Sequence, residues 1–120
     1  MTEVCAFAQS EGYDVFNPIG KYLEKGDEES LSAWFSDNLE ISILAPGNIS
    51  SKNQAKQILK SFFEKHKPRE FKVTHKAEEG KMKYAVGTLS AGGELYVVAV
   101  FLHYDGKAYK IQQMKIDRFE

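Results

Sequence analysis

The sequence predicts an α+β domain in which N-terminal helices pack on a strongly curved antiparallel sheet. Residues 94–104, ELYVVAVFLHY, are apolar on both strand parities, which is typical of a central strand covered on both faces. Residues 71–116 contain further strand-like runs joined by short glycine-containing links, and such links favour antiparallel hairpins. The apolar stripes with helical spacing all precede Pro68. Helices followed by a meander of strands therefore define the fold class.

Composition limits the kind of protein. The 120 residues, 42% of them hydrophobic, suffice for one globular core without disulfides. A formal net charge of −1 argues against nucleic-acid binding, which needs a surplus of Lys and Arg. Cys5 is the single cysteine, which excludes an internal disulfide and a thiolate metal cluster. No apolar run reaches the roughly 18 residues of a membrane-spanning helix, so no membrane span is expected.

The first residues suggest two expectations. Residues 1–13 are polar and without period, so we expect a loosely ordered lead-in before a single domain over residues 14–120. Val4 to Gln9 has the small-x-small pattern of a signal-peptidase site, but no basic and apolar regions precede it. The chain as given thus carries no complete export signal. Periplasm or cell envelope is the alternative if residues 1–8 are the remnant of a signal peptide.

Two helices are expected next. The first starts near Asp14 or Asn17, either of which can accept a backbone N–H, and ends at Gly26. Asp27 then caps a second, shorter helix. Each helix has one apolar stripe to bury, made of Val15, Phe16, Ile19, Tyr22 and Leu23 in the first and of Leu31, Trp34 and Phe35 in the second.

A strand, a long helix and four more strands follow. Residues 39–43 alternate apolar and polar side chains as a half-buried strand. Ser51-x-x-Gln54 is a capping box, which predicts an amphipathic helix that Pro68 stops. Its buried stripe comprises Ala55, Ile58, Leu59, Phe62 and Phe63. The four strands of the meander are expected at residues 71–77, 82–89, 95–104 and 108–116.

Several motifs resemble a known superfamily. They are Gly26-Asp27, Leu31-Ser32-Ala33-Trp34-Phe35, Ser51-Lys52-Asn53-Gln54-Ala55, Ile58-Leu59-Lys60-Ser61-Phe62-Phe63, Pro68 and Ile111-Gln112-Gln113-Met114-Lys115-Ile116. With them the chain resembles the nuclear transport factor 2-like, or cystatin-like, superfamily over roughly residues 14–117. Within it, the chain is similar to a bacterial family of unknown function. The resemblance implies a cone, in which a bent sheet wraps a long helix and leaves a cavity, and it brings no catalytic motif.

The candidate ligand pocket of such a cone comprises Trp34, His75, Tyr84, Tyr96 and Gln113. His75 shares strand parity with Phe71 and Val73, so it is expected on the core side. Tyr84 lies on the more apolar parity of its strand. A mostly apolar lining with a few polar anchors is typical of small-molecule sites. The alternative for each of these residues is ordinary core filling.

Catalytic and metal signals are weak. Asp37 and His75 are the candidate bases, and no second carboxylate is expected on a core-facing position of the meander. His66 is expected to be structural at a helix C-terminus, and His103 to lie at the rim or surface. The sequence lacks the His-x-His, Cys-x-x-Cys and Glu-x-x-His spacings of metal sites, so neither a metal nor another cofactor is expected.

Two functions remain in competition. The first is a non-enzymatic small-ligand-binding or protein-interaction module that forms a homodimer through the outer face of the sheet, because residues 94–104 are apolar on both sides. The second is an acid/base isomerase, dehydratase or hydrolase acting on a small apolar molecule in the cone. Asp37 or His75 would be its base and Tyr84 its hydrogen-bond donor.

Overall fold

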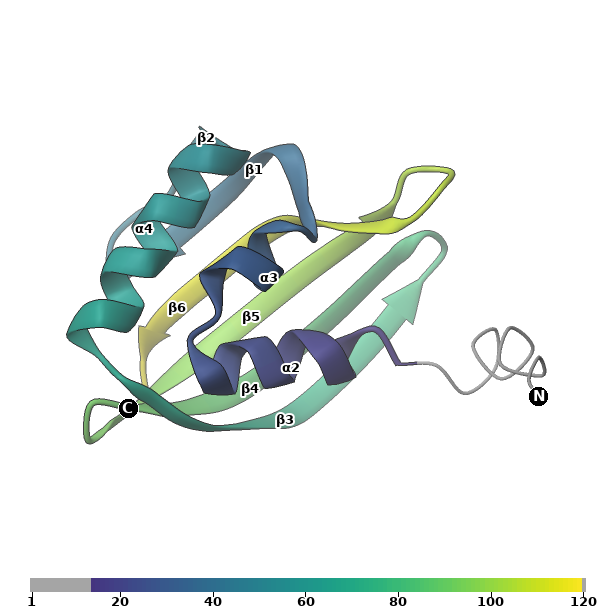
Figure 1. Cartoon of the computed structure of the whole chain (residues 1–120). Coiled ribbons are helices and arrows are strands. Elements are labelled where there is room, and N and C mark those ends of the chain that lie inside the picture. The colour runs from purple at the N-terminus through teal and green to yellow at the C-terminus, as the bar shows by residue number, and fades with distance from the viewer. Residues whose placement is uncertain (1–13, 120) are drawn as a thin grey trace, which may run out of the picture.

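One sheet carries a layer of helices on a single face. The computed structural model describes residues 14–119, and Figure 1 shows their arrangement. The elements are α2 (Phe16–Lys25), α3 (Glu28–Ser32), β1 (Phe35–Ile43), β2 (Asn48–Ser51), α4 (Lys52–Lys65), β3 (Pro68–Glu79), β4 (Met82–Ala91), β5 (Glu94–Tyr104) and β6 (Tyr109–Arg118). The expected lead-in over residues 1–13, and with it the possible signal-peptide remnant, lies outside the described residues.

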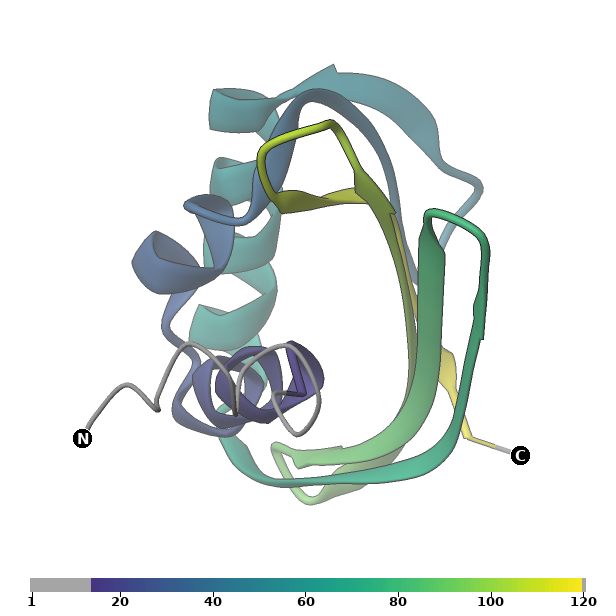
Figure 2. The same cartoon turned by 90° about the vertical axis from the view of Figure 1, so that its right-hand side faces the viewer.

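The sheet has the strand order β2-β1-β6-β5-β4-β3. Strands β3 to β6 form the expected antiparallel meander, and β1 joins it by a parallel pairing with β6. Figure 2 shows the sheet curling around the helices, so the predicted α+β class with a curved sheet is confirmed. The strand β2, which pairs with β1, was not predicted, because its four residues are too few for a periodic signal.

The core lies between the helices and the inner, concave face of the sheet. Tyr96, Val98, Val100 and Leu102 of β5 are buried on this face, as their shared parity predicts. The helices cover them with a second set of fully buried side chains that includes Ile19, Leu23, Leu31, Ala55 and Leu59. Full burial of one such leucine stabilises a fold by about 1.5–3 kcal/mol, so this contact between layers dominates the stability.

The helix ends follow the local signals in the sequence. Ser51 Oγ accepts the backbone N–H of Gln54 at 3.2 Å and Gln54 Oε1 accepts that of Ser51 at 3.1 Å, which confirms the predicted capping box. Gly26 ends α2 in the left-handed region, at φ 67°. Asp27 caps α3 by accepting both the backbone N–H and the hydroxyl of Ser30.

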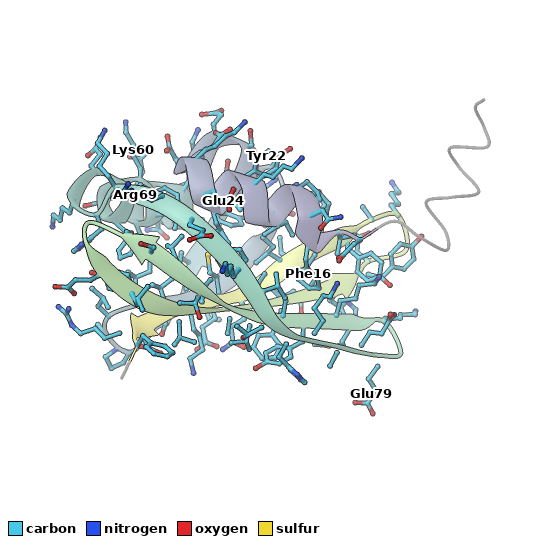
Figure 3. All side chains as sticks on the ribbon, turned by 90° about the horizontal axis from the view of Figure 1, so that it is seen from below. Phe16, Tyr22, Glu24, Lys60, Arg69 and Glu79 are labelled. Atoms are coloured by element: carbon cyan, nitrogen blue, oxygen red, sulfur yellow. The ribbon has the colours of Figure 1, made fainter. Side chains whose placement is uncertain are left out.

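Helix α2 lies close to the sheet where β3 meets β4. Glu24 of α2 accepts the backbone N–H of Phe71 in β3 at 3.1 Å, and Figure 3 shows Glu24 on the part of α2 beside that strand. The Phe71 ring covers Gly87 of β4, where a Cβ atom would lie 2.4 Å from Phe71 Cζ and 2.6 Å from the Lys72 carbonyl oxygen. Glycine at position 87 therefore allows an aromatic ring to lie flat on the sheet beneath α2.

Replacing Gly87 tests this close approach. We expect Gly87→Ala to lower the free energy of unfolding by about 1–3 kcal/mol, because either the Phe71 ring or the strand β3 has to move. Urea denaturation would measure the loss. In the double variant Phe71→Leu/Gly87→Ala the loss should be smaller than the sum of the two single losses. Full additivity would show that the two residues do not share this contact.

The Asp27 cap gives α3 a dependence on pH. The two hydrogen bonds from Ser30 hold the pKa of the Asp27 carboxyl below its ordinary value of 3.8. Since the folded-state pKa is depressed, the contribution is present above pH 3.8 and is lost as the pH falls through the folded-state pKa. We expect Asp27→Ala to cost about 1 kcal/mol at pH 7 and less below pH 3.8. Asp27→Asn, which keeps a capping oxygen, should remain near the wild type at pH 7.

Candidate functional site

The outer face of the sheet, which points away from the helices, carries a broad apolar surface. We call it the outer patch, and it comprises Met82, Tyr84, Val86, Leu95, Val97, Ala99, Phe101 and Phe119. The alternate residues of β5 are half-buried here even though no helix or strand within residues 14–119 covers them. At the margins, Met82 is 40% exposed, Leu95 47% and Phe119 53%. Large apolar side chains are thus accessible on this face.

The pairing register collects three of the expected pocket residues on this outer face. Tyr84, Phe101 and Gln113 occupy one row across β4, β5 and β6. The rings of Tyr84 and Phe101 lie 4.4 Å apart between centroids, and the His75 ring lies 6.1 Å from that of Tyr84. His75, Tyr84 and Gln113 therefore lie together, but outside the cone.

The prediction that His75 faces the core is wrong, because β3 contains a bulge. The register shifts between Val73 and His75, so that Val73 is paired with Gly87 and His75 with Val86. An extra residue in a strand reverses the side of every side chain after it. Phe71 consequently packs against the core, whereas His75 is exposed on the outer face.

The outward position of Tyr84 has a packing cause. Strand β4 turns Ala85, Gly87, Leu89 and Ala91 toward the helices, and the Phe71 ring occupies the space above Gly87. Tyr84 and Val86, on the other parity, point to the outside. The more apolar parity of β4 is therefore the outer one, contrary to the expectation.

The remaining expected pocket residues lie elsewhere. Trp34 is half-buried against the hydrophobic core at the start of β1. Tyr96 is fully buried on the inner face of β5. The structure thus does not bring the five expected residues into one pocket.

The two candidate bases are separated from each other. Asp37 is exposed on β1, and His75 is exposed on β3. Three strands lie between β1 and β3, which separates the two residues by about 19 Å along the curved sheet at the usual strand spacing. They cannot act on the same bond of a small substrate.

A polar pair that sequence reasoning missed joins α4 to β5. The phenol oxygen of Tyr96 lies 3.1 Å from Nδ1 of His66, the residue that ends α4, and 3.5 Å from Glu94 Oε1. The His66 ring also lies 4.8 Å from that of Phe62. Burial and the nearby Glu94 carboxylate raise the pKa of Tyr96 above its ordinary value of 10.0. His66 was expected at this helix end. Its contact with Tyr96 was not expected, because Tyr96 lies 30 residues further along the chain and the pair forms no local sequence pattern.

Beside this pair lies an open groove of about 500 Å³ between α4 and the end of β1. We call it the α4 groove. Its apolar lining is made of Ile43, Leu44, Ile58 and Phe62, and its polar lining of Gln57, Ser61, Lys65 and His66. The groove lies on the helix side of the sheet, so it is a separate surface from the outer patch.

Two further properties concern residues 14–119. In that part of the chain, no three or more His, Cys, Asp and Glu side chains are arranged to hold a metal ion. None of the helices described there is both long and apolar enough to cross a membrane.

Comparison with known proteins identifies the fold and a family. The family model for a domain of unknown function, DUF4783, matches residues 16–117. No curated protein matches the chain. The chain is similar to the crystal structure of a DUF4783 family protein from Bacteroides uniformis, with a TM-score of 0.84 at 21% identity over 89% of this chain and 99% of that one. A DUF4783 family protein from Bacteroides ovatus gives 0.81 at 24% identity over 85% and 93%.

A more distant structural neighbour carries the name of the fold. It is an NTF2-like protein of unknown function from Cytophaga hutchinsonii, with a TM-score of 0.64 at 10% identity over 88% of each chain. The fold is therefore nuclear transport factor 2-like. The resemblance to that superfamily, and within it to a family of unknown function, is confirmed.

The phenol of Tyr96 can be tested by titration. Because its folded-state pKa is raised, it should ionise above pH 10.0. Its contribution to stability should be present below pH 10.0 and be lost as the pH rises through the folded-state pKa. We expect the absorbance change of one late-ionising phenol to disappear in Tyr96→Phe. In the control Tyr104→Phe, which removes a phenol bound to the Gly106 carbonyl, the late change should remain. A late change that persists in Tyr96→Phe would contradict the assignment.

Proposed function

The chain belongs to the DUF4783 family, a domain of unknown function, and from the geometry of this member we propose that it is a non-enzymatic interaction module that forms a homodimer through the outer patch. The single observation behind the proposal is the exposed apolar surface on the sheet face opposite the helices. Leu95 and Met82, each exposed by 40% or more, stand at its margins. Surfaces of this kind commonly mark association sites.

The position of the patch suits contact with a second copy. The outer patch follows neighbouring strands β4 and β5, so two such faces can pack against each other along these two strands. Along its border, β6 presents Lys115 opposite Ala99 and Asp117 opposite Val97. An isologous interface pairs a surface with itself, and a border that carries both charge signs can then form ion pairs across the two-fold axis.

The acid/base alternative has less support from the geometry. Each of its alternative bases, Asp37 and His75, is exposed, and neither lines the α4 groove. The candidate donor Tyr84 is stacked against Phe101 on the outer face. A dimer through this face would cover Tyr84 with protein and leave no room there for substrate.

A lysine at the margin of the patch tests the proposed dimer. Leu95→Lys places a charge on an exposed position, so it should leave the fold intact while raising the dissociation constant of the dimer at least tenfold. Sedimentation velocity over a concentration series would measure the dissociation. The matched control is Ile58→Lys, because Ile58 is 41% exposed on α4, on the helix side.

The outcomes separate clearly. The proposal requires a wild-type protein of twice the chain mass, a largely monomeric Leu95→Lys variant and a dimeric Ile58→Lys variant. A wild-type protein that stays monomeric at high concentration would refute it. Dissociation by Ile58→Lys alone would assign the interface to the helix side.

A further inference from the structure

We propose that the α4 groove binds a small amphipathic carboxylate, with the acid group at Lys65 and His66 and the apolar tail along α4. This inference goes beyond the proposed dimer, because the groove and the outer patch lie on opposite sides of the sheet. A failure of one proposal therefore leaves the other standing.

The dimensions and lining of the groove fit a small ligand. Its volume of about 500 Å³ lies within the range of roughly 300–1,000 Å³ that small-molecule sites occupy. Ile58 and Leu44 contribute apolar side chains that are exposed in the absence of a ligand. Leu44 is also the one non-glycine residue in 14–119 with a positive φ, 60°. A bulky residue held in this unfavourable conformation is found more often at binding sites than elsewhere.

A second hollow extends the groove along the helix. It shares Gln57 and Ile58 with the α4 groove and continues to Ile49, which is 70% exposed, and to Asn53 near the start of α4. From Asn53 to His66 the helix rises by about 20 Å. The two hollows together offer a long, partly apolar channel rather than a round pocket, and this shape suits an extended alkyl tail.

The charged residues of the lining indicate which sign of ligand charge the groove favours. Lys65 and His66 are the ionisable residues that line the groove, and the lining contains no carboxylate. A carboxylate is therefore complementary to this end of the groove, whereas an ammonium group is not. The C-terminal end of the α4 dipole opposes an anion, and Lys65 in the last turn offsets it. Apolar contact along the channel should consequently supply most of the affinity.

Tyr96 fixes the His66 ring for this contact. Its phenol oxygen occupies Nδ1 of His66, which leaves Nε2 as the ring nitrogen available to a ligand. The phenol has one proton and two acceptors, His66 Nδ1 at 3.1 Å and Glu94 Oε1 at 3.5 Å, and the proposal takes the shorter contact as the one that receives it. A neutral imidazole that accepts at Nδ1 carries its own proton on Nε2. The ring then presents an N–H donor to a carboxylate oxygen. Tyr96 is thus a positioning residue for this site, and it does not touch the ligand itself.

Titration of the full chain with alkyl compounds tests the proposal. We would add octanoate, decanoate and dodecanoate, each below its micelle concentration, and follow binding by calorimetry and by NMR shifts of the His66 ring and the Ile58 methyl groups. The affinity should rise by about two- to fourfold per methylene, as expected for partial to full burial. Decanoate should bind more tightly than decanol, and decylamine should bind most weakly.

Matched variants separate charge from apolar contact. Lys65→Gln should weaken decanoate about two- to fivefold and leave decanol unchanged. Lys60→Gln removes the same charge from the opposite flank of α4, where Lys60 lines a different hollow (Figure 3). It should leave the affinities for decanoate and decanol unchanged. Ile58→Ser should weaken both ligands. Tyr96→Phe should reduce the preference for decanoate over decanol while the effect of chain length persists.

Several results would overturn the proposal. One is the absence of binding at millimolar concentration, and another is equal affinity for decanoate and decylamine. NMR shift changes confined to residues of the outer patch would place the ligand on that face and not in the α4 groove. NMR contacts between residues 1–13 and Ile58 in the free protein would show that the chain covers its own groove. Conversion of a dimer to a monomer by Ile58→Ser would make the groove an interface between copies.

Discussion

The structure depends on the burial of β5. One face of this strand, from Tyr96 to Leu102, is enclosed completely, and the helices are arranged to enclose it. Strands β4 and β6 pair with the two edges of β5, and the helix layer covers its inner face. The burial of four large side chains on one strand sets where the helix layer has to lie, and the curvature of the sheet brings both α2 and α4 within reach (Figure 2).

The same strand explains why the two faces of the sheet differ. The inner face is concave and crowded, and β4 has a glycine at position 87, beneath the Phe71 ring. The outer face is convex and open, and Tyr84 of β4 and Phe101 of β5 lie there. The apolar outer patch is therefore partly a consequence of close packing on the other side. The α4 groove lies at the border of the core, between α4 and the end of β1.

The elements with local signals could be predicted from the sequence, and the site could not. The Ser51 to Gln54 capping box, the Gly26 stop and the meander each depend on neighbouring residues, and the structure has all of them. The side on which His75 lies depends on a bulge one residue before it, which no periodic pattern reveals. The contact between His66 and Tyr96 depends on the closing of the whole fold. The orientation of β4 likewise depends on Phe71, a residue of another strand.

The bulge in β3 has a further consequence for assembly. This strand is the last in the sheet that residues 14–119 form, so one side of its backbone has no strand of that part of the chain to bond with. An uninterrupted edge of that length would invite a strand of another molecule to continue the sheet without limit. The irregularity before His75, together with Pro68 and the charged Lys72 and Lys76, makes this edge a poor template. Association through the outer face, as proposed, would stop at a closed pair, whereas association by the edge would grow into a fibre.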